Sequence, residues 1–318
     1  MKKPVKITLI VLSVLVVLFL AVTFGGGAYM VKFALQPDDR GYNMEQERAK
    51  MESRVPGIIA WWDGQIQKGA LRDTFVVFPD GRRMHAQYLP AVLPSKKTAI
   101  LVHGYQNNPT NMCVLARMYH EDLGYNVFLP GLFGHGQSAG DAVQMGWKDR
   151  LDMLVWIPIA HELFGDESQV VHGFSMGAAT TMMLSGEPTP DYVKCFIEDA
   201  GYSDVWNMYK YQLKEMFGLP PFPILYGAEI ICKLRFGWSF HEASSLKQLA
   251  KCEKPMFFIH GGNDDFVPTA MLEVCYAAKT HGYKEIWEVP GSIHVYSNVD
   301  HPEEYLRRVS AFLDKVGM

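Results

Sequence analysis

The sequence has few cysteines, and their placement excludes two common roles. The chain of 318 residues contains five cysteines, an odd number, and no Cys-x-x-Cys pair. A disulfide framework needs paired cysteines and a structural zinc site needs closely spaced ligands, so neither is supported. No group of histidines and carboxylates has metal-ligand spacing either, so we expect no metal and no cofactor. We expect most of the cysteines to be buried free thiols; they are Cys113, Cys195, Cys232, Cys252 and Cys275.

Blocks of charge of one sign are also absent. Charged residues make up 20% of the chain, apolar residues 48%, and the net charge is −4. Without a basic block or a basic–aromatic stripe, nucleic acid is not an expected partner. The composition is that of a globular protein with an ample core, and the length suits one large α/β domain or two ordinary domains.

One long apolar run stands at the amino end. Three lysines within the first six residues precede Ile7–Phe24, which is interrupted only by three hydroxyl side chains. This run is just long enough to cross a hydrocarbon layer of about 30 Å, and it exceeds the usual apolar core of a signal peptide. We therefore expect residues 1–28 to form a transmembrane anchor. The small residues Gly26-Gly27-Ala28 leave a cleaved signal peptide, and thus a secreted protein, as the alternative.

The charges around this run predict its orientation. Lysines precede it and little charge follows directly after it, which favours an amino end in the cytoplasm. The protein would then be a single-pass protein of the cell membrane with its bulk outside the cytoplasm. No lipobox cysteine follows the run, so a lipid anchor is not indicated. Residues 29–69, with charges such as Glu45 and Arg48, are predicted to form a juxtamembrane helical segment.

From residue 70 to residue 318, apolar strands alternate with helical segments. The first two strands, Thr74–Phe78 and Arg83–Leu89, are separated by the turn Pro79-Asp80-Gly81. Such alternation predicts an α/β fold whose mainly parallel sheet has helices on both faces. Further strands are predicted at 99–102, 126–129, 195–198, 256–259 and 284–289, one more ends at residue 174, and helices are predicted at 111–123, 143–164 and 302–316.

One segment interrupts the alternation. More than fifty residues separate the strand that ends near Glu198 from the strand that begins near Met256, too many for a simple crossover. Asp204–Phe217 and Ile224–Phe236 are predicted to be two helices separated by Leu219–Pro223. We expect a small helical lid at about 202–245, above the carboxyl ends of the strands. Its aromatic and methionine residues also suit simple packing of the insertion onto the domain.

A serine stands at the centre of the predicted sheet. Gly173-Phe174-Ser175-Met176-Gly177 follows an apolar β-branched pair and precedes small, helix-forming residues. A strand, a sharp turn and a helix in this order raise the hydroxyl above the sheet edge, where the helix directs its first N–H groups. This pattern predicts a nucleophilic serine, Ser175. A small-residue turn that happens to match the loose Gly-x-Ser-x-Gly pattern is the alternative.

A nucleophilic serine needs a base and an acid. His294 lies in a loop between the last predicted strand and the terminal helix, and histidine is the natural base near neutral pH. The acid is expected in the loop after the preceding strand, where Asp264 and Asp265 are adjacent candidates. The chain order serine, acid, histidine is that of the α/β-hydrolase elbow and differs from the chymotrypsin and subtilisin orders.

The remaining histidines have structural explanations. His103 and His260 end strands beside glycines, and we expect them to satisfy backbone groups beneath the site. His135 is expected to brace its own loop. His172 precedes the elbow and is poorly placed to act as a base. Surface or otherwise satisfied positions are expected for His161, His241 and His281.

Together these motifs resemble the α/β-hydrolase superfamily over about residues 70–316. Within it, the chain is similar to bacterial serine hydrolases of the S33 peptidase and bile-acid acyltransferase-like groups. The segments that carry the resemblance are His103-Gly104-Tyr105, Gly134-His135-Gly136-Gln137-Ser138, Gly173–Gly177, Asp264–Pro268 and His294.

The resemblance implies roles for individual residues. The family pattern Asp-x-x-Val-Pro assigns the acid to Asp264, with Asp265 as the alternative. The His-Gly loop implies that the backbone N–H of Tyr105 forms one half of an oxyanion hole and that of Met176 the other. Pro130 departs from the pattern, because many relatives have an acidic residue there, before the Gly-His-Gly loop. We regard that loop as structural.

The sequence therefore predicts a membrane-anchored serine hydrolase that cleaves an ester, thioester or amide through an acyl-enzyme. A carboxylesterase-like activity is favoured over an S33-type peptidase, because nothing in the sequence indicates a pocket for a peptide amine. A non-catalytic α/β-hydrolase-fold binding protein is the alternative from another class. The expected partner is a small-molecule or peptide substrate with an acyl group, and the sequence leaves its identity and the oligomeric state open.

Overall fold

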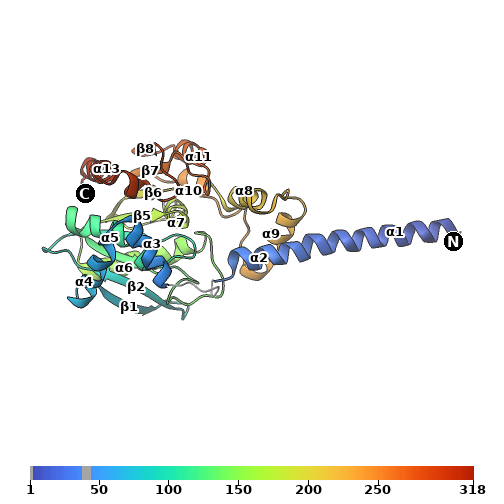
Figure 1. The fold of residues 1–318 in the computed structure, drawn as a ribbon, viewed down its shortest axis with the longest axis horizontal. Coiled ribbons are helices and arrows are strands. Elements are labelled where there is room, and N and C mark those ends of the chain that lie inside the picture. Colours follow the sequence, from blue (N-terminus) through green and yellow to red (C-terminus); the bar gives the residue numbers. More distant parts are fainter. Residues whose placement is uncertain (1–2, 38–43) are drawn as a thin grey trace. The chain divides into compact units, whose positions relative to one another are not determined.

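A computed structural model describes residues 3–37 and 44–318 of the chain (Figure 1). The chain divides into two compact units. The smaller unit consists of Met1–Gln36 and Asp204–Ala243, and the larger unit consists of Pro37–Ser203 and Ser244–Met318. We describe the larger unit first, because it contains every predicted site residue.

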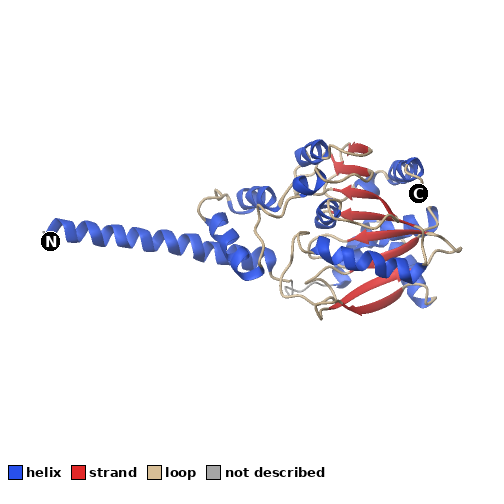
Figure 2. Cartoon of the chain, turned by 180° about the vertical axis from the view of Figure 1, so that it is seen from behind, coloured by secondary structure: helices blue, strands red, loops and turns tan. Residues whose placement is uncertain are grey.

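The larger unit is built on one eight-stranded sheet, drawn in red in Figure 2. The strand order is β1-β2-β4-β3-β5-β6-β7-β8. β2 is antiparallel to β1 and to β4, and all other neighbouring strands are parallel. The predicted mainly parallel sheet is thus confirmed. The strands are β1 (Arg72–Val77), β2 (Arg83–Leu89), β3 (Lys97–Val102), β4 (Asn126–Pro130), β5 (Ser168–Phe174), β6 (Val193–Asp199), β7 (Met256–Gly261) and β8 (Lys284–Val289).

Helices cover both faces of this sheet. On one face, Trp62, Leu115 and Phe312 belong to a hydrophobic cluster with alternate residues of the central strands. On the other face, Trp156 packs against Phe128 of β4. The sheet is therefore buried on both sides, as its continuously apolar strands predict. The helices of this unit are α3 (Met44–Arg54), α4 (Ile58–Gln67), η2 (Pro109–Met112), α5 (Cys113–Arg117), η3 (Met118–Asp122), α6 (Asp149–Phe164), α7 (Met176–Leu184), α10 (Ser245–Leu249), α11 (Ala270–Ala278), α12 (Ser297–Asp300) and α13 (Pro302–Lys315).

Two predicted helices differ from the observed ones. The helix predicted at 143–164 begins only at Asp149, because Met145 and Gly146 have positive φ angles and the Asp149 carboxylate accepts a hydrogen bond from the Gly146 N–H. The segment predicted as one helix at 111–123 is divided into η2, α5 and η3, a 3₁₀ turn, a short α-helix and a π turn.

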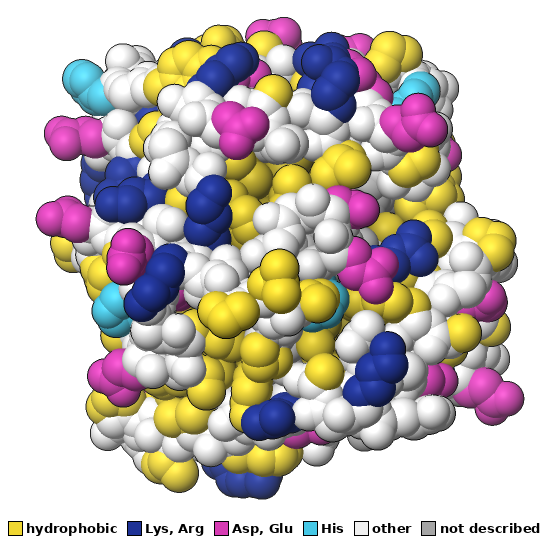
Figure 3. Space-filling model, turned by 90° about the vertical axis from the view of Figure 1, so that its left-hand side faces the viewer, with side chains coloured by type: hydrophobic (Ala, Val, Ile, Leu, Met, Phe, Trp, Pro, Cys, Tyr) yellow, Lys and Arg dark blue, Asp and Glu magenta, His cyan; other side chains and the backbone are white. Residues whose placement is uncertain are grey.

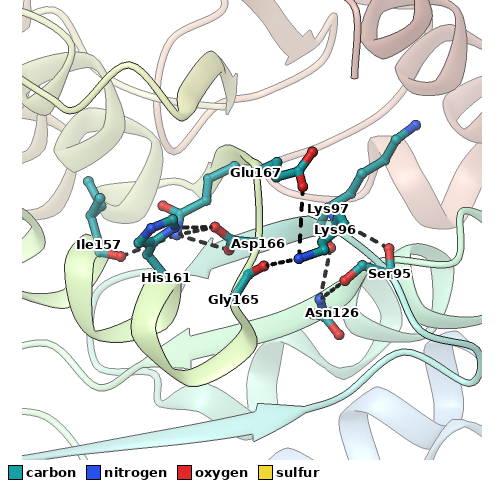
Figure 4. A network of polar contacts seen from close by, with 10 residues as sticks. Ser95, Lys96, Lys97, Asn126, Ile157, His161, Gly165, Asp166 and Glu167 are labelled. Carbon is teal, nitrogen blue, oxygen red and sulfur yellow. Dashed lines mark hydrogen bonds and ion pairs between the residues drawn. The ribbon is translucent and has the colours of Figure 1, made fainter.

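A polar network fixes the amino ends of the central strands, at the sheet edge opposite the serine (Figure 4). Lys96 Nζ donates to the Gly165 carbonyl over 2.9 Å, which ties the start of β3 to the end of α6. The Asn126 side chain donates to the carbonyls of Ser95 and Lys97. The His161 ring lies 2.8 Å from Asp166, so this histidine is a satisfied position, as expected.

On the face of the molecule drawn in Figure 3, acidic and basic side chains are interspersed.

One buried histidine, His172, forms hydrogen bonds to two tyrosines in the core. Tyr305 donates to Asp199, so its oxygen accepts from Nε2 of His172, and Nδ1 of His172 accepts from Tyr119. Burial lowers the pKa of His172 to about 3. His172 is therefore neutral in the folded protein and, as the sequence indicated, is not placed to act as a base.

The smaller unit joins the amino-terminal helix to the inserted segment. α1 (Lys3–Leu20) passes through a π turn, η1 (Ala21–Gly25), into α2 (Gly26–Leu35), and α9 lies beside α2 (Figure 1). Over the described residues, the continuous stretch Val5–Leu35 is the one helix long and apolar enough to cross a membrane. Both inserted helices are confirmed, as α8 (Val205–Phe217) and α9 (Ile224–Phe236). Their role as a lid stays a prediction.

Two glycines allow the backbone of α9 to touch the backbones of η1 and α2. A Cβ atom on Gly227 would lie 2.1 Å from the Thr23 carbonyl oxygen, and one on Gly27 would lie 2.6 Å from the Ala228 nitrogen. Both distances are far below van der Waals contact. Any larger side chain at either position would therefore force the two helices apart.

We expect Gly227→Ala to weaken this helix pair by about 1–3 kcal/mol, because the added methyl group overlaps a backbone oxygen. The α8–α9 connection, residues 218–223, should then be cleaved faster by a protease in the detergent-solubilised protein. Gly25→Ala is the matched control, because nothing lies within 4 Å of its added Cβ. Equal cleavage rates in the two variants would contradict this packing.

We expect His172 to make the protein sensitive to acid. An unfolded histidine takes up a proton below about pH 6.5, and folded His172 does so only near pH 3. Its contribution to stability is thus present above pH 6.5 and is lost as the pH falls, at about 1.4 kcal/mol per pH unit. The free energy of unfolding, measured with denaturant, should therefore fall less steeply between pH 6 and pH 4 in His172→Gln than in the wild type. His281→Gln, at an exposed histidine, should keep the wild-type slope.

Candidate functional site

The turn at Ser175 has the geometry of a nucleophile elbow. β5 ends at Phe174, α7 begins at Met176, and Ser175 between them has φ 55° and ψ −116°. A non-glycine residue in this region is strained, typically by about 1–3 kcal/mol. A Cβ on Gly177 would lie 2.0 Å from the Val102 carbonyl oxygen, so only glycine lets α7 start this close to β3.

The structure brings the three predicted site residues together. Nε2 of His294 lies 2.8 Å from Oγ of Ser175, and Nδ1 of His294 lies 2.7 Å from Oδ2 of Asp264. These residues come from the loops after β5, β7 and β8, at the carboxyl edge of the sheet. Residues up to 119 positions apart in the chain thus form a continuous hydrogen-bonded line.

The carboxylate in this line belongs to Asp264. Its second oxygen, Oδ1, accepts hydrogen bonds from the backbone N–H groups of Phe266 and Val267, at 3.0 and 2.9 Å. Asp265, the other candidate acid, is exposed. The turn therefore directs the first of the two adjacent aspartates inward.

Asp264 is held in its charged form. Burial raises the pKa of this carboxyl, but hydrogen bonds from His260 and His294 more than offset that effect and hold the pKa well below its usual range. The carboxylate is consequently ionised at any pH near neutrality. It can orient the His294 ring and stabilise a positive charge on it.

The sequence did not indicate that His260 contacts this carboxylate. His260 Nε2 lies 2.9 Å from the Val267 carbonyl oxygen, which is the backbone contact we expected, and also 3.1 Å from Asp264 Oδ2. Burial lowers the pKa of His260, but Asp264 and the nearby Glu198 raise it by a larger amount. The only signal was the four-residue spacing at the end of a strand, which is not specific.

A buried acidic pair lies beneath the site at the end of β6. Burial raises the pKa of Glu198 to about 8 and that of Asp199 to about 7. Glu198 accepts a hydrogen bond from the Gly201 N–H, and Asp199 accepts one from Tyr305. The Asp199 carbonyl also accepts from the Ser175 N–H, which fixes the elbow to β6.

Both residues predicted for the oxyanion hole adjoin Ser175. Met176 is the first residue of α7, and Tyr105 lines the same pocket as Ser175 and His294. A Cβ on Gly104 would lie 3.4 Å from the Ser175 Cβ, so the loop after β3 passes directly beside the serine. That their backbone N–H groups donate hydrogen bonds to an oxyanion stays a prediction.

A pocket of about 430 Å³ opens at Ser175. One wall of this pocket is formed by α3. The sequence did not predict this, because it indicated only a juxtamembrane helical segment there. Lys50 of α3 pairs with Glu47 over 2.8 Å, and Glu47 accepts from the side chain of Asn111, which also lines the pocket. The Arg54 guanidinium lies over the Tyr296 ring at 4.2 Å. No motif in the sequence connects α3 with the serine. Its pocket-lining residues are Gln46, Glu47, Lys50, Met51 and Arg54.

Two further histidines have the structural roles predicted for them. The His103 ring donates to the Gly104 carbonyl from Nδ1 and accepts from the Leu132 N–H at Nε2. The His135 ring lies 2.9 Å from the Phe133 carbonyl in its own loop. Burial lowers the pKa of His103 to about 3 and that of His135 to about 4, so both are neutral.

The described parts of the chain contain no cluster of side chains suited to binding a metal ion. Within residues 3–37 and 44–318, no three histidine, cysteine or acidic side chains are placed to hold a metal ion. All five cysteines are buried and free, as the sequence predicted.

Comparison with known proteins identifies the family. Residues 99–223 match the model of the α/β-hydrolase fold. The uncharacterized protein YqkD of Bacillus subtilis (strain 168) is 30% identical over 220 residues, which cover 69% of this chain and 72% of that protein. The protein bem46 of Schizosaccharomyces pombe is 22% identical over 201 residues, 63% of this chain and 62% of that protein.

Solved structures show the same fold. The Pyrococcus furiosus esterase Pf2001 superposes with a TM-score of 0.63 at 22% identity, over 77% of this chain and 91% of that one. A membrane phospholipase A described as a bacterial virulence factor superposes with a TM-score of 0.56 at 18% identity, over 83% and 93%. These structures share the fold of this chain, and the family model together with the 30% identical Bacillus subtilis relative shows that the chain belongs to the α/β-hydrolase superfamily.

Proposed function

We propose that this chain is a serine hydrolase that cleaves an acyl bond, most readily an ester, through an acyl-enzyme intermediate. The observation that carries the proposal is the line from Ser175 Oγ through His294 to Asp264, with contacts of 2.8 and 2.7 Å. These distances lie within the range at which a base can take a proton from a nucleophile.

In the proposed mechanism, Ser175 Oγ attacks the acyl carbon while its proton passes to His294 Nε2. Asp264 accepts the Nδ1–H of His294 and stabilises the imidazolium. The ring then protonates the leaving group, and the acyl-enzyme forms. Water, deprotonated by His294, attacks the acyl carbon, and the proton returns to Ser175 as the acid product leaves.

Negative charge develops on the acyl oxygen in both steps. The backbone N–H groups of Tyr105 and Met176 are the proposed donors to that oxygen. Met176 begins α7, so its N–H also benefits from the positive end of the helix dipole. Loss of one donor from such a hole typically costs about 10²–10³ in rate.

An ester is the proposed substrate class, and two features support it. The pocket is lined by Ser175 and His294 together with both polar and apolar residues, and the Pyrococcus furiosus protein of the same fold is an esterase. A thioester or amide, the latter as in an S33-type peptidase, would use the same groups. A purely binding function leaves the strained Ser175 backbone and its contact with His294 without an explanation.

We further propose that the amino-terminal helix is a retained membrane anchor, with its amino end in the cytoplasm and the hydrolase domain outside. The helix continues without a break through Gly26–Ala28, where a signal peptidase would cut. Gly27 lies against the backbone of α9. Cleavage there would remove Thr23 and Gly27, whose backbones contact Gly227 and Ala228 of α9, which supports retention.

We expect Ser175→Ala to lose its reaction with a fluorophosphonate probe and to lower p-nitrophenyl ester hydrolysis by about 10⁴-fold or more, because the nucleophile is gone. Gel fluorescence and initial rates measure the two effects. Ser95→Ala, in the polar network at the other sheet edge, is the control and should behave as wild type. A wild-type protein that fails to react with the probe would support a binding function instead.

We expect Asp264→Asn to lower kcat by about 10³–10⁴-fold with little change in KM, because the imidazole loses its orienting charge. Asp265→Asn, at the adjacent exposed carboxylate, should remain within about twofold of wild type. Steady-state kinetics on the same ester distinguish the two. If the change at 265 is the damaging one, the acid is assigned wrongly.

A further inference from the structure

Large hydrophobic side chains form an exposed ridge along α9. Phe222, just before the helix, is 60% exposed, and it is followed at intervals of four residues by Tyr226, Ile230 and Leu234, which are 47%, 46% and 83% exposed. Residues four apart lie on one face of a helix. A soluble protein seldom leaves such a continuous apolar face in water, so the ridge indicates an apolar partner.

The face of α9 next to the ridge packs against the proposed anchor. Gly227 contacts the Thr23 backbone, and Ala228 contacts Gly27. The Phe222 ring lies 5.8 Å from the Phe19 ring, centroid to centroid. The start of α9 thus lies level with Phe19, which is inside the apolar run and not at its end.

The position of Phe19 in the helix places it inside a bilayer. Lys6 and Lys32 are the nearest charged residues on either side of this run, and 25 uncharged residues stand between them. A hydrocarbon layer of about 30 Å takes about 20 helical residues. Any such stretch between the two lysines ends at residue 26 or later, so Phe19 lies about 10 Å or more inside the outer boundary.

We propose that the tip of the α8–α9 hairpin, Pro220–Tyr226, enters the outer leaflet beside the anchor and that lipid acyl chains cover the part of the ridge at this tip, Phe222 and Tyr226. This inference rests on the proposed membrane anchor. The hairpin and the anchor would then form a single membrane-embedded unit.

The chemistry around the ridge matches this placement. Trp206 packs edge-on against Tyr226 at 4.9 Å, and such aromatic side chains are enriched where hydrocarbon meets headgroups. Lys233 and Arg235 are exposed in the last turn of α9, at the end away from Phe19. Lys233 pairs with Glu242 over 2.8 Å, and the positive side chain of Arg235 at that level would meet lipid phosphates.

The test uses the full-length chain in phosphatidylcholine nanodiscs. The native cysteines are buried, so an environment-sensitive fluorophore can be attached to one introduced cysteine. Phe222→Cys reports on the hairpin tip, Leu15→Cys on the anchor, and Val92→Cys on an exposed loop of the hydrolase domain. Lipids with a nitroxide quencher on the acyl chain measure contact with hydrocarbon.

We expect at least a twofold loss of fluorescence at positions 222 and 15 and none at 92. Quenching at 15 but not at 222 would overturn the inference and leave the anchor intact. A blue-shifted but unquenched signal at 222 would show that protein, such as a second copy of the chain, covers the ridge, and would also overturn it. No quenching at 15 would refute the membrane anchor itself, and the inference with it.

Discussion

The site depends on how closely α7 packs against the ends of β3 and β5. Gly177, the second residue of this helix, lies against the Val102 carbonyl, and a Cβ on Gly173 would lie 2.1 Å from the Gly177 carbonyl oxygen. With no side chains between them, the helix and strands leave Ser175 no relaxed backbone conformation, and its φ is 55°. The hydroxyl is held toward His294 by this packing, so the strain at the serine is maintained by the whole sheet.

Beneath the serine, the protein places several ionisable groups in its interior and controls their charge. Asp264 keeps its charge because His260, His294 and two backbone N–H groups surround it. Glu198 lacks a comparable set of donors, and burial raises its pKa. Glu198 at the end of β6 thus has a raised pKa, whereas Asp264, in the loop after the neighbouring strand β7, has a lowered one. The ionised one contacts the histidine, where its charge can stabilise an imidazolium.

The smaller unit has a different physical basis. Its helices meet at glycines, so backbone contact and not a bulky core holds α2 to α9. This kind of packing is common between helices in membranes, where small residues allow close approach. The apolar ridge on the outer side of α9 fits the same environment. The amino-terminal helix and the hairpin therefore form one compact unit, although about 170 residues separate them in the chain.

The sequence by itself determined the alternation of strands and helices, the elbow at Ser175 and the candidates for its partners, because periodicity and turn chemistry are local. It left Asp264 and Asp265 adjacent and equal except by resemblance to a family, and only the fold of their turn directs Asp264 toward His294. The contact of His260 with that carboxylate, the α3 wall of the pocket and the pairing of α2 with α9 were not predicted. The last two join residues distant in sequence through packing, and no local pattern encodes such contacts, while the four-residue spacing of His260 and Asp264 is too common to predict theirs.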